Sequence, residues 1–214
     1  RRARAMEKHS KFGRNEQEHA WQNAEVNALY RLAEVGVRVP RPYGCFDGVL
    51  LMELITDGDG HEAPRLNDVS MSKEQALEDH SVMMHYVTRM LHAGMIHGDL
   101  SEFNVLVDEY GPVIIDLPQV VDAAANNNAK RFLQRDVNKI TAHYAMYAPE
   151  LLDSRYAEEI WALYEAGDLN PEVELTGQFE ESELTVDVDV VLQEIKAAML
   201  EEQERQERLR EAAQ

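Results

Sequence analysis

The spacing of apolar residues predicts a helix early in the chain. Between residues 17 and 35, apolar side chains recur every three to four positions, which is typical of an amphipathic helix. Gly36 is expected to end it. Glu25 interrupts the apolar stripe, so its carboxylate needs a cationic partner or a position at the stripe's edge, where it reaches solvent.

Two short strands are predicted next. Residues 43–46 alternate between polar and apolar, residues 49–55 are mostly apolar, and Asp47-Gly48 between them is a tight-turn sequence. Pro40 and Pro42 favour an extended segment over residues 37–42. A connection rich in Gly and Asp then covers residues 56–71.

A second helix is predicted from Ser72 to Gly94, because Ser72 and Gln75 have the spacing of a capping box. Short apolar runs predict strands at 95–97, 105–107 and 113–115, around a polar loop. Further helices are expected at 130–147, 155–166 and 188–212, with an irregular acidic stretch over residues 171–185. The predicted inward face of the 130–147 helix consists of Leu133, Val137, Ile140 and Tyr144.

Composition indicates a soluble protein. Of the 214 residues, 44% are hydrophobic and 29% are charged, which is ordinary for globular domains. No apolar run reaches the roughly 20 residues of a membrane span, so no membrane association is expected. A single cysteine, Cys45, excludes an internal disulfide and favours a reducing, cytoplasmic setting.

The charge is strongly negative, at −19, and this argues against direct binding of nucleic acids. It is unevenly distributed. Residues 1–16 are basic and lack periodicity, so we expect a flexible loop there. From Asp168 onward the chain is mostly acidic, and residues 168–214 are expected to form an extension that ends in a helix.

The segment His97–Asn104 carries the strongest chemical signal. It fits the pattern H-x-D-L-x-x-x-N in every fixed position. In this pattern Asp99 orients an attacking hydroxyl and accepts its proton, while Asn104 reaches a metal ion that bridges phosphates. His97 is expected to hydrogen-bond a backbone carbonyl, and Asp136 to bond the same loop from a neighbouring helix.

Asp116 supplies a second signal, since it directly follows the apolar run Val113–Ile115. In kinases an acid at this place holds Mg²⁺ against the triphosphate. Oxygen ligands from Asn104 and Asp116 suit Mg²⁺ far better than zinc. Ser101 has two open interpretations: it contacts the γ-phosphate, or it satisfies backbone amides within the turn.

Residues 100–104 together with residues 114–119 resemble the signature of the RIO family of atypical protein serine/threonine kinases, including bacterial RIO-type members. Ordinary protein kinases have Phe-Gly after the metal-binding Asp, whereas this chain has Leu117-Pro118-Gln119. The resemblance implies an α+β, two-lobed protein-kinase-like fold with a trimmed large lobe. The remainder of the small lobe and the hinge would cover residues 17–55, and the large lobe residues 56–167.

The resemblance also implies roles for individual residues. Asp99 would be catalytic, Asn104 and Asp116 would bind metal, and Glu25 would pair with an ATP-contacting lysine. Backbone groups of the hinge segment, which includes Met52, Glu53 and Ile55, would bind adenine. ATP with Mg²⁺, or Mn²⁺ in its place, would be the cofactors, and the family's proposed aspartyl-phosphate would give Asp116 a second role as nucleophile.

No Gly-rich loop and no strand with the ATP-contacting lysine occur in the sequence. We expect both to precede residue 1, so that only part of the small lobe is present. Two alternatives to a protein kinase or ATPase remain. One is a small-molecule phosphotransferase acting on aminoglycoside- or choline-like cations, and the other is a non-catalytic binding module gated by nucleotide.

Overall fold

The computed structural model describes residues 24–46 and 49–180, which mix helices with small antiparallel sheets. The chain divides into two units, Arg1–Gln178 and Phe179–Gln214, and the fold below belongs to the first. The predicted α+β class is confirmed. The basic segment 1–16 and the predicted helix 188–212 lie outside the described residues, and the lobe boundaries stay predictions.

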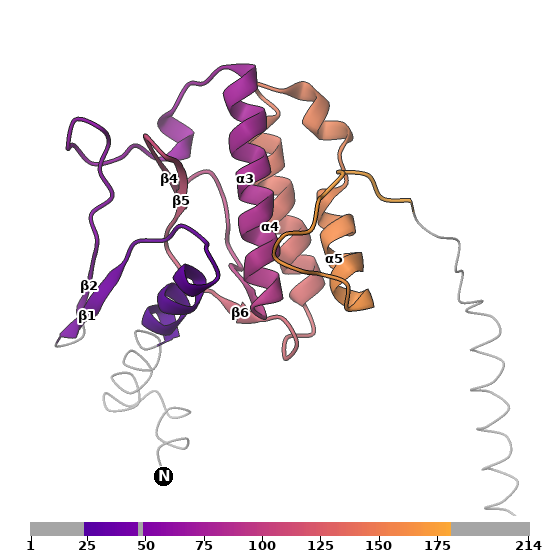
Figure 1. Ribbon diagram of the computed structural model, residues 1–214, viewed down its shortest axis with the longest axis horizontal. Helices are drawn as coiled ribbons and strands as arrows, with labels where there is room; N and C mark the ends of the chain where they lie inside the picture. Colours follow the sequence, from indigo (N-terminus) through magenta and orange to yellow (C-terminus); the bar gives the residue numbers. More distant parts are fainter. Residues whose placement is uncertain (1–23, 47–48, 181–214) are drawn as a thin grey trace, which may run out of the picture. The chain divides into compact units, whose positions relative to one another are not determined.

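The described residues up to Met52 form one helix and one hairpin (Figure 1). The helix is described over residues 24–34, within the predicted range. It is followed by a turn in which Gly36 has a φ of +77°. Strands β1 (Pro42–Phe46) and β2 (Val49–Met52) pair antiparallel, with Phe46 opposite Val49.

The predicted extension of the second strand to residue 55 is wrong, because β2 ends at Met52. The N–H of Glu53 still donates to the carbonyl of Arg41 at 2.8 Å. The N–H of Arg41 donates to the Glu53 side-chain carboxylate at 3.1 Å and not to the Glu53 carbonyl, so the return bond of the ladder is not formed. The chain leaves the sheet at Glu53, and residues 53–55 connect the hairpin to the rest of the unit.

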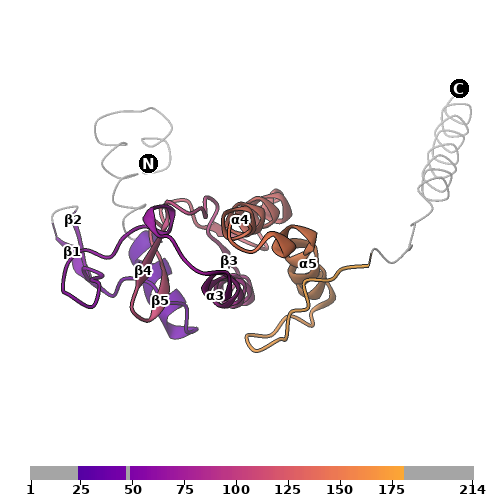
Figure 2. The ribbon, with the colours of Figure 1, turned by 90° about the horizontal axis from the view of Figure 1, so that it is seen from above.

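Further along the same unit, three helices pack side by side (Figures 1 and 2). They are α3 (Lys73–His92), α4 (Ala129–Tyr144) and α5 (Tyr156–Ala166). One half of the predicted capping box is confirmed, since the Ser72 side chain accepts from the N–H of Gln75 at 3.1 Å. The other half is not formed, because the Gln75 side chain donates to Asp79 at 2.9 Å. Helix α4 ends three residues before the predicted 147. Two short 3-10 helices, η1 (Leu66–Asp68) and η2 (Pro149–Asp153), were not predicted.

Short strands position the segments between α3 and α4. Strand β3 (Met95–Ile96) pairs with β6 (Val121–Asp122), which the sequence did not predict. Strands β4 (Val105–Asp108) and β5 (Gly111–Ile114) form a hairpin in which Val105 faces Ile114. The pairing brings the polar loop before β4 next to the residues that follow β5.

The core lies between the helices, the β3–β6 pair and the β4–β5 hairpin. The four residues predicted to face inward on α4 are all buried, and so is the apolar stripe of α3. The first helix contributes Leu32, which is fully buried against this core. None of the helices in residues 24–46 and 49–180 has both the length and the apolar character that a bilayer span requires.

The core also contains a histidine, and it makes stability depend on pH. His80 is 1% exposed and lies 2.9 Å from the Thr141 hydroxyl. Burial lowers its pKa from the ordinary 6.5 to about 4. Between these pH values the unfolded chain binds a proton that the folded chain does not, so stability falls as pH drops from 6.5 towards 4.

We expect His80→Phe to flatten this pH dependence, by up to about 1.4 kcal/mol per pH unit in the free energy of unfolding. Urea titrations at several pH values between 4.5 and 7.5 measure the slope. His85→Phe, on the same helix, controls for loss of a histidine. An unchanged slope in His80→Phe would contradict the assignment.

Candidate active site

A cavity of about 470 Å³ lies among the first helix, the segment after β2 and the β4–β5 hairpin. Six of the eight site residues predicted from the sequence line it, whereas Asp99 and Ser101 do not. The six residues are Glu25, Met52, Glu53, Ile55, Asn104 and Asp116. Segments separated by up to about ninety positions in the sequence thus meet around one space.

Residues Glu53, Leu54 and Ile55, which follow β2, line this cavity. The N–H of Glu53 is bonded to Arg41, and the carbonyl of Ile55 accepts from the N–H of Ala63 at 3.0 Å. Within the described ranges, the carbonyl of Glu53 and the N–H of Ile55 have no hydrogen bond. A free acceptor and a free donor two residues apart therefore remain at the edge of the cavity.

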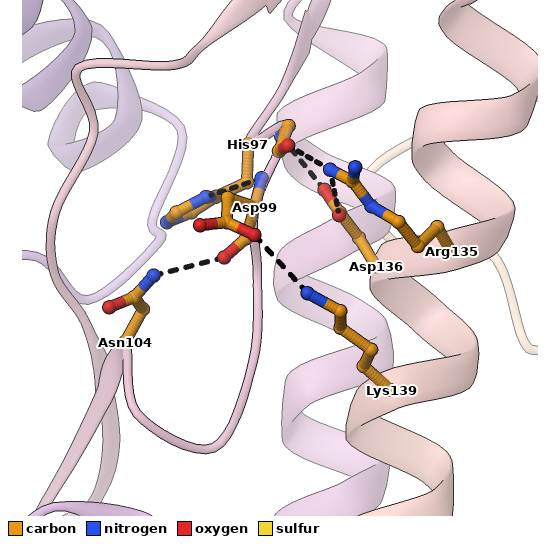
Figure 3. A network of polar contacts seen from close by, with 7 residues as sticks. His97, Asp99, Asn104, Arg135, Asp136 and Lys139 are labelled. Atoms are coloured by element: carbon orange, nitrogen blue, oxygen red, sulfur yellow. Dashed lines mark hydrogen bonds and ion pairs between the residues drawn. The ribbon is translucent and has the colours of Figure 1, made fainter.

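Asn104 is held in place by backbone hydrogen bonds. Its N–H donates to the carbonyl of Ser101 at 2.9 Å, and its carbonyl accepts from the N–H of Ile115 at 3.0 Å. Its side-chain Nδ2 donates to the carbonyl of Asp99 at 2.9 Å (Figure 3). Because the amide nitrogen is engaged in this way, the amide oxygen is left to accept a further bond or to bind a metal ion.

Asp116 has a backbone conformation that is rare for a residue with a side chain. Its φ is +64°, and no other non-glycine residue in the described part of the chain has a positive φ. This left-handed conformation costs about 1 to 2 kcal/mol, although Asp and Asn tolerate it better than most residues. Such strain gathers at functional sites, where the surrounding structure imposes it.

Glu25 is close enough to Asp116 to feel its charge. Partial burial raises the pKa of Glu25, the negative charge of Asp116 raises it further, and the backbone N–H of Leu117 acts in the opposite direction. Among the described residues Glu25 forms no ion pair with a lysine or arginine. A nearby cation would relieve the repulsion, as the predicted lysine partner would do.

The loop that carries Asp99 is attached to α4 by a buried carboxylate. Asp136, which is 2% exposed, accepts a hydrogen bond from the N–H of Gly98 at 2.8 Å. Arg135 donates to the carbonyl of Gly98 and lies 3.4 Å from the other Asp136 oxygen. The prediction that Asp136 bonds the loop is confirmed (Figure 3).

The electrostatics of Asp136 follow from this position. Burial raises its pKa to about 6, against the opposing effect of the N–H groups of Gly98 and Leu100 and of the Arg135 guanidinium. These donors bond the charged form, so the contact between helix and loop is strongest above that pH.

His97 connects the loop to Ile115, the residue that follows β5. Its Nε2 lies 3.0 Å from the carbonyl of Ile115, and its Nδ1 lies 3.3 Å from the N–H of Asp99. A carbonyl only accepts, so Nε2 carries the proton and Nδ1 accepts from Asp99. Burial lowers the pKa of His97 and favours this neutral form. The predicted bond from His97 to a backbone carbonyl is confirmed.

The Asp99 carboxylate has a partner that the sequence analysis missed. Lys139 of α4 places its Nζ 3.2 Å from Asp99 Oδ1 (Figure 3), and both side chains are about two-fifths exposed. The available signal was its position three residues after Asp136, which puts both on the same side of a helix. Ser101 is 8% exposed, and its role stays a prediction.

The family model described as RIO domain matches residues 1–157. RIO-type serine/threonine-protein kinase Rio1 of Haloferax volcanii is 38% identical over 121 residues, which are 56% of this chain and 40% of that protein. Rio1 of Thermoplasma acidophilum is 29% identical over 150 residues, covering 70% of this chain and 77% of that protein.

Serine/threonine-protein kinase RIO1 of Homo sapiens is 31% identical over 136 residues, which cover 63% of this chain and 24% of the human protein. The chain thus spans well under half of the length of several relatives that it matches. The similarity covers the region that contains the cavity and the loop.

Gly98 gives a test of how tightly the loop is packed. Its φ is +83°, and a Cβ there would lie 2.5 Å from the carbonyl oxygen of Gln119. Gly94 has a similar φ of +77°, yet a Cβ there would have no atom within 4 Å. Both alanine variants incur the left-handed penalty of about 1 to 2 kcal/mol, but only Gly98→Ala also forces backbone atoms apart.

We therefore expect Gly98→Ala to lower the free energy of unfolding clearly more than Gly94→Ala does. Urea denaturation of the two variants and the parent protein measures the difference. Equal losses would show that the loop and the Gln119 segment are not packed as described.

Proposed function

The chain belongs to the RIO domain family, and on this premise we propose that it transfers the γ-phosphoryl group of ATP as a RIO-type serine/threonine kinase or ATPase. One observation carries the proposal. The cavity joins the free backbone groups near Glu53 to the oxygen ligands Asn104 and Asp116, and Asn104 is bonded directly to the Asp99 backbone.

The adenine end of the nucleotide fits the segment after β2. Adenine has an amino donor beside a ring-nitrogen acceptor, so it complements the free carbonyl of Glu53 and the free N–H of Ile55. Apolar side chains in the cavity lining, among them Leu29, Met52 and Leu106, supply contact for the flat ring.

The phosphate end fits Asn104 and Asp116. In the part of the chain that the structure describes, no group of three or more His, Cys, Asp or Glu side chains could hold a metal ion. Two protein oxygen ligands completed by phosphate oxygens and water are the usual arrangement for Mg²⁺. We propose Mg²⁺, with Mn²⁺ as a substitute. The bound ion neutralises charge on the phosphates during transfer.

In this proposal Asp99 acts at the acceptor side. The acceptor oxygen forms a bond to the γ-phosphorus, the bond from that phosphorus to the β–γ bridging oxygen breaks, and ADP leaves. The hydroxyl proton goes to the Asp99 carboxylate. With a serine or threonine as acceptor the protein is a kinase, and with water it is an ATPase.

A second route uses Asp116 as the nucleophile. A carboxylate oxygen of Asp116 would take the phosphoryl group with release of ADP, and water would then cleave the aspartyl-phosphate. A phosphorylated Asp116 from which hydroxylamine releases the phosphate, leaving a hydroxamate, would identify this route. Its absence during rapid turnover would favour direct transfer.

Further features of the protein belong to the same proposal. Glu25 pairs with a lysine that contacts ATP, and Ser101 contacts the γ-phosphate. The relatives are named serine/threonine kinases, which favours a protein acceptor over an aminoglycoside- or choline-like cation. The charge of −19 opposes direct nucleic-acid binding. We place the protein in the cytoplasm, in keeping with a single cysteine.

The two aspartates should separate binding from turnover. Asp116→Asn keeps the left-handed backbone accessible but removes the charge that holds the metal ion, so Mg²⁺-dependent nucleotide affinity should fall at least about tenfold. Asp99→Asn should leave that affinity unchanged and lower turnover by about 10² to 10⁴. Fluorescent ATP titrations with Mg²⁺ or with EDTA, together with ADP release, measure both effects.

Asp153→Asn is the matched control, since Asp153 is exposed in η2 and does not line the cavity. Equal loss of nucleotide binding in the Asp99 and Asp116 variants would contradict the division of roles. Full biological function without turnover would instead favour the non-catalytic, nucleotide-gated module.

A further inference from the structure

Lys139 is outside every motif identified in the sequence, yet its ammonium group contacts the Asp99 carboxylate at 3.2 Å. We propose that Lys139 is a positioning residue for phosphoryl transfer, which holds Asp99 Oδ1 so that Oδ2 faces the acceptor hydroxyl. The inference rests on the proposed function and adds a residue to the machinery of the same site.

The other supports of the loop act on its backbone. Asp136 and Arg135 bond the N–H and the carbonyl of Gly98, while His97 and Asn104 bond the N–H and the carbonyl of Asp99. These contacts fix the path of the loop but leave the Asp99 side chain free to rotate. Among the described residues, only Lys139 makes a hydrogen bond to the carboxylate itself (Figure 3).

Lys139 is well anchored for this task. Its neighbours Val137 and Ile140 are buried in the core, and Asp136 is bonded to the loop three residues earlier. The start of the Lys139 side chain is therefore fixed relative to the backbone of Asp99. Only the flexible stem has to be ordered for Nζ to reach the carboxylate.

The oxygens of Asp99 then have different roles. Oδ1 is bonded to Lys139, whereas Oδ2 has no hydrogen bond within residues 24–46 and 49–180 and is free to accept a proton. Small displacements of a reacting group are costly in enzymes, of the order of 10²-fold for about 1 Å. A side chain that merely narrows the orientations of Asp99 therefore affects turnover strongly.

The same contact contributes little to folding. Both side chains are about two-fifths exposed, and exposed ion pairs stabilise proteins only weakly. Loss of Lys139 should therefore appear in catalysis and leave both stability and nucleotide binding nearly unchanged. This separation distinguishes a positioning residue from a structural one.

The experiment compares Lys139→Met with Lys139→Arg in the full-length protein. ADP formation from Mg·ATP is the readout, because it counts transfer to water as well as to a hydroxyl. We expect kcat to fall about tenfold in Lys139→Met, with the KM for ATP unchanged, because only transition-state positioning is lost. Lys139→Arg should restore most of the rate, since it keeps a cation within reach of Asp99.

Lys130→Met is the matched control. Lys130 lies on the same helix and its side chain is 54% exposed, but its ion-pair partner is Glu165 at 3.8 Å, on α5. The variant removes a lysine and a surface ion pair from α4 without affecting Asp99. Its kcat should equal that of the parent protein.

A double-mutant cycle with Asp99→Asn tests whether Lys139 acts through Asp99. Lys139→Met should have little further effect when Asp99 is already replaced, whereas independent sites give additive losses. If Asp99→Asn forms no measurable ADP, the decision rests on kcat, KM and the rescue by arginine.

Parent-like kcat in Lys139→Met would overturn the inference, and so would a loss that arginine does not rescue or that comes with weaker nucleotide binding. An additive cycle would overturn it as well. A parent protein that forms no ADP from Mg·ATP would instead contradict the proposed function, and the role of Lys139 would fail with it.

Discussion

The buried contact between Asp136 and the N–H of Gly98 is the interaction on which the candidate site depends. A carboxylate that is 2% exposed must be bonded to donors, and here the donors are backbone groups of the loop. The helix α4 is held by the core through Val137, Ile140 and Tyr144. Because α4 is fixed in the core, the bond from Asp136 also holds in place a loop that has no regular secondary structure of its own.

From this fixed point the remaining geometry follows by short steps. The His97 side chain is hydrogen-bonded to the carbonyl of Ile115, and the carbonyl of Asn104 accepts from the N–H of the same residue. Asp116 comes directly afterwards, in a left-handed conformation. Asp99, Asn104 and Asp116 are thus brought together because residues 97–104 are hydrogen-bonded to Ile115, which lies about ten residues further along the chain.

Much of this arrangement could be predicted from the sequence. The helices, the hairpins and the cap at Ser72 have local causes, because periodicity and capping act over a few residues. Asp99, Asn104 and Asp116 could be named because their spacing reflects the chemistry that they perform, whereas Glu25, Met52, Glu53 and Ile55 could be named only through the resemblance to the RIO family. Six of the eight named site residues line one cavity, and their individual roles remain proposals.

Other features depend on contacts that no local pattern records. The strand β2 ends at Met52, where the N–H of Arg41 bonds the Glu53 side chain and not its carbonyl, and β6 is too short to have a pattern of its own. Lys139 meets Asp99 only through the packing of α4 against the loop. The left-handed conformation of Asp116 likewise has no signal in the local sequence.

The most direct measurement of the central claim is a crystal structure of the full-length protein with Mg²⁺ and a non-hydrolysable ATP analogue. The account predicts the metal ion on the Asn104 amide oxygen and the Asp116 carboxylate, with adenine bonded to the backbone of Glu53 and Ile55. A nucleotide bound elsewhere, or a metal ion that contacts neither side chain, would contradict it.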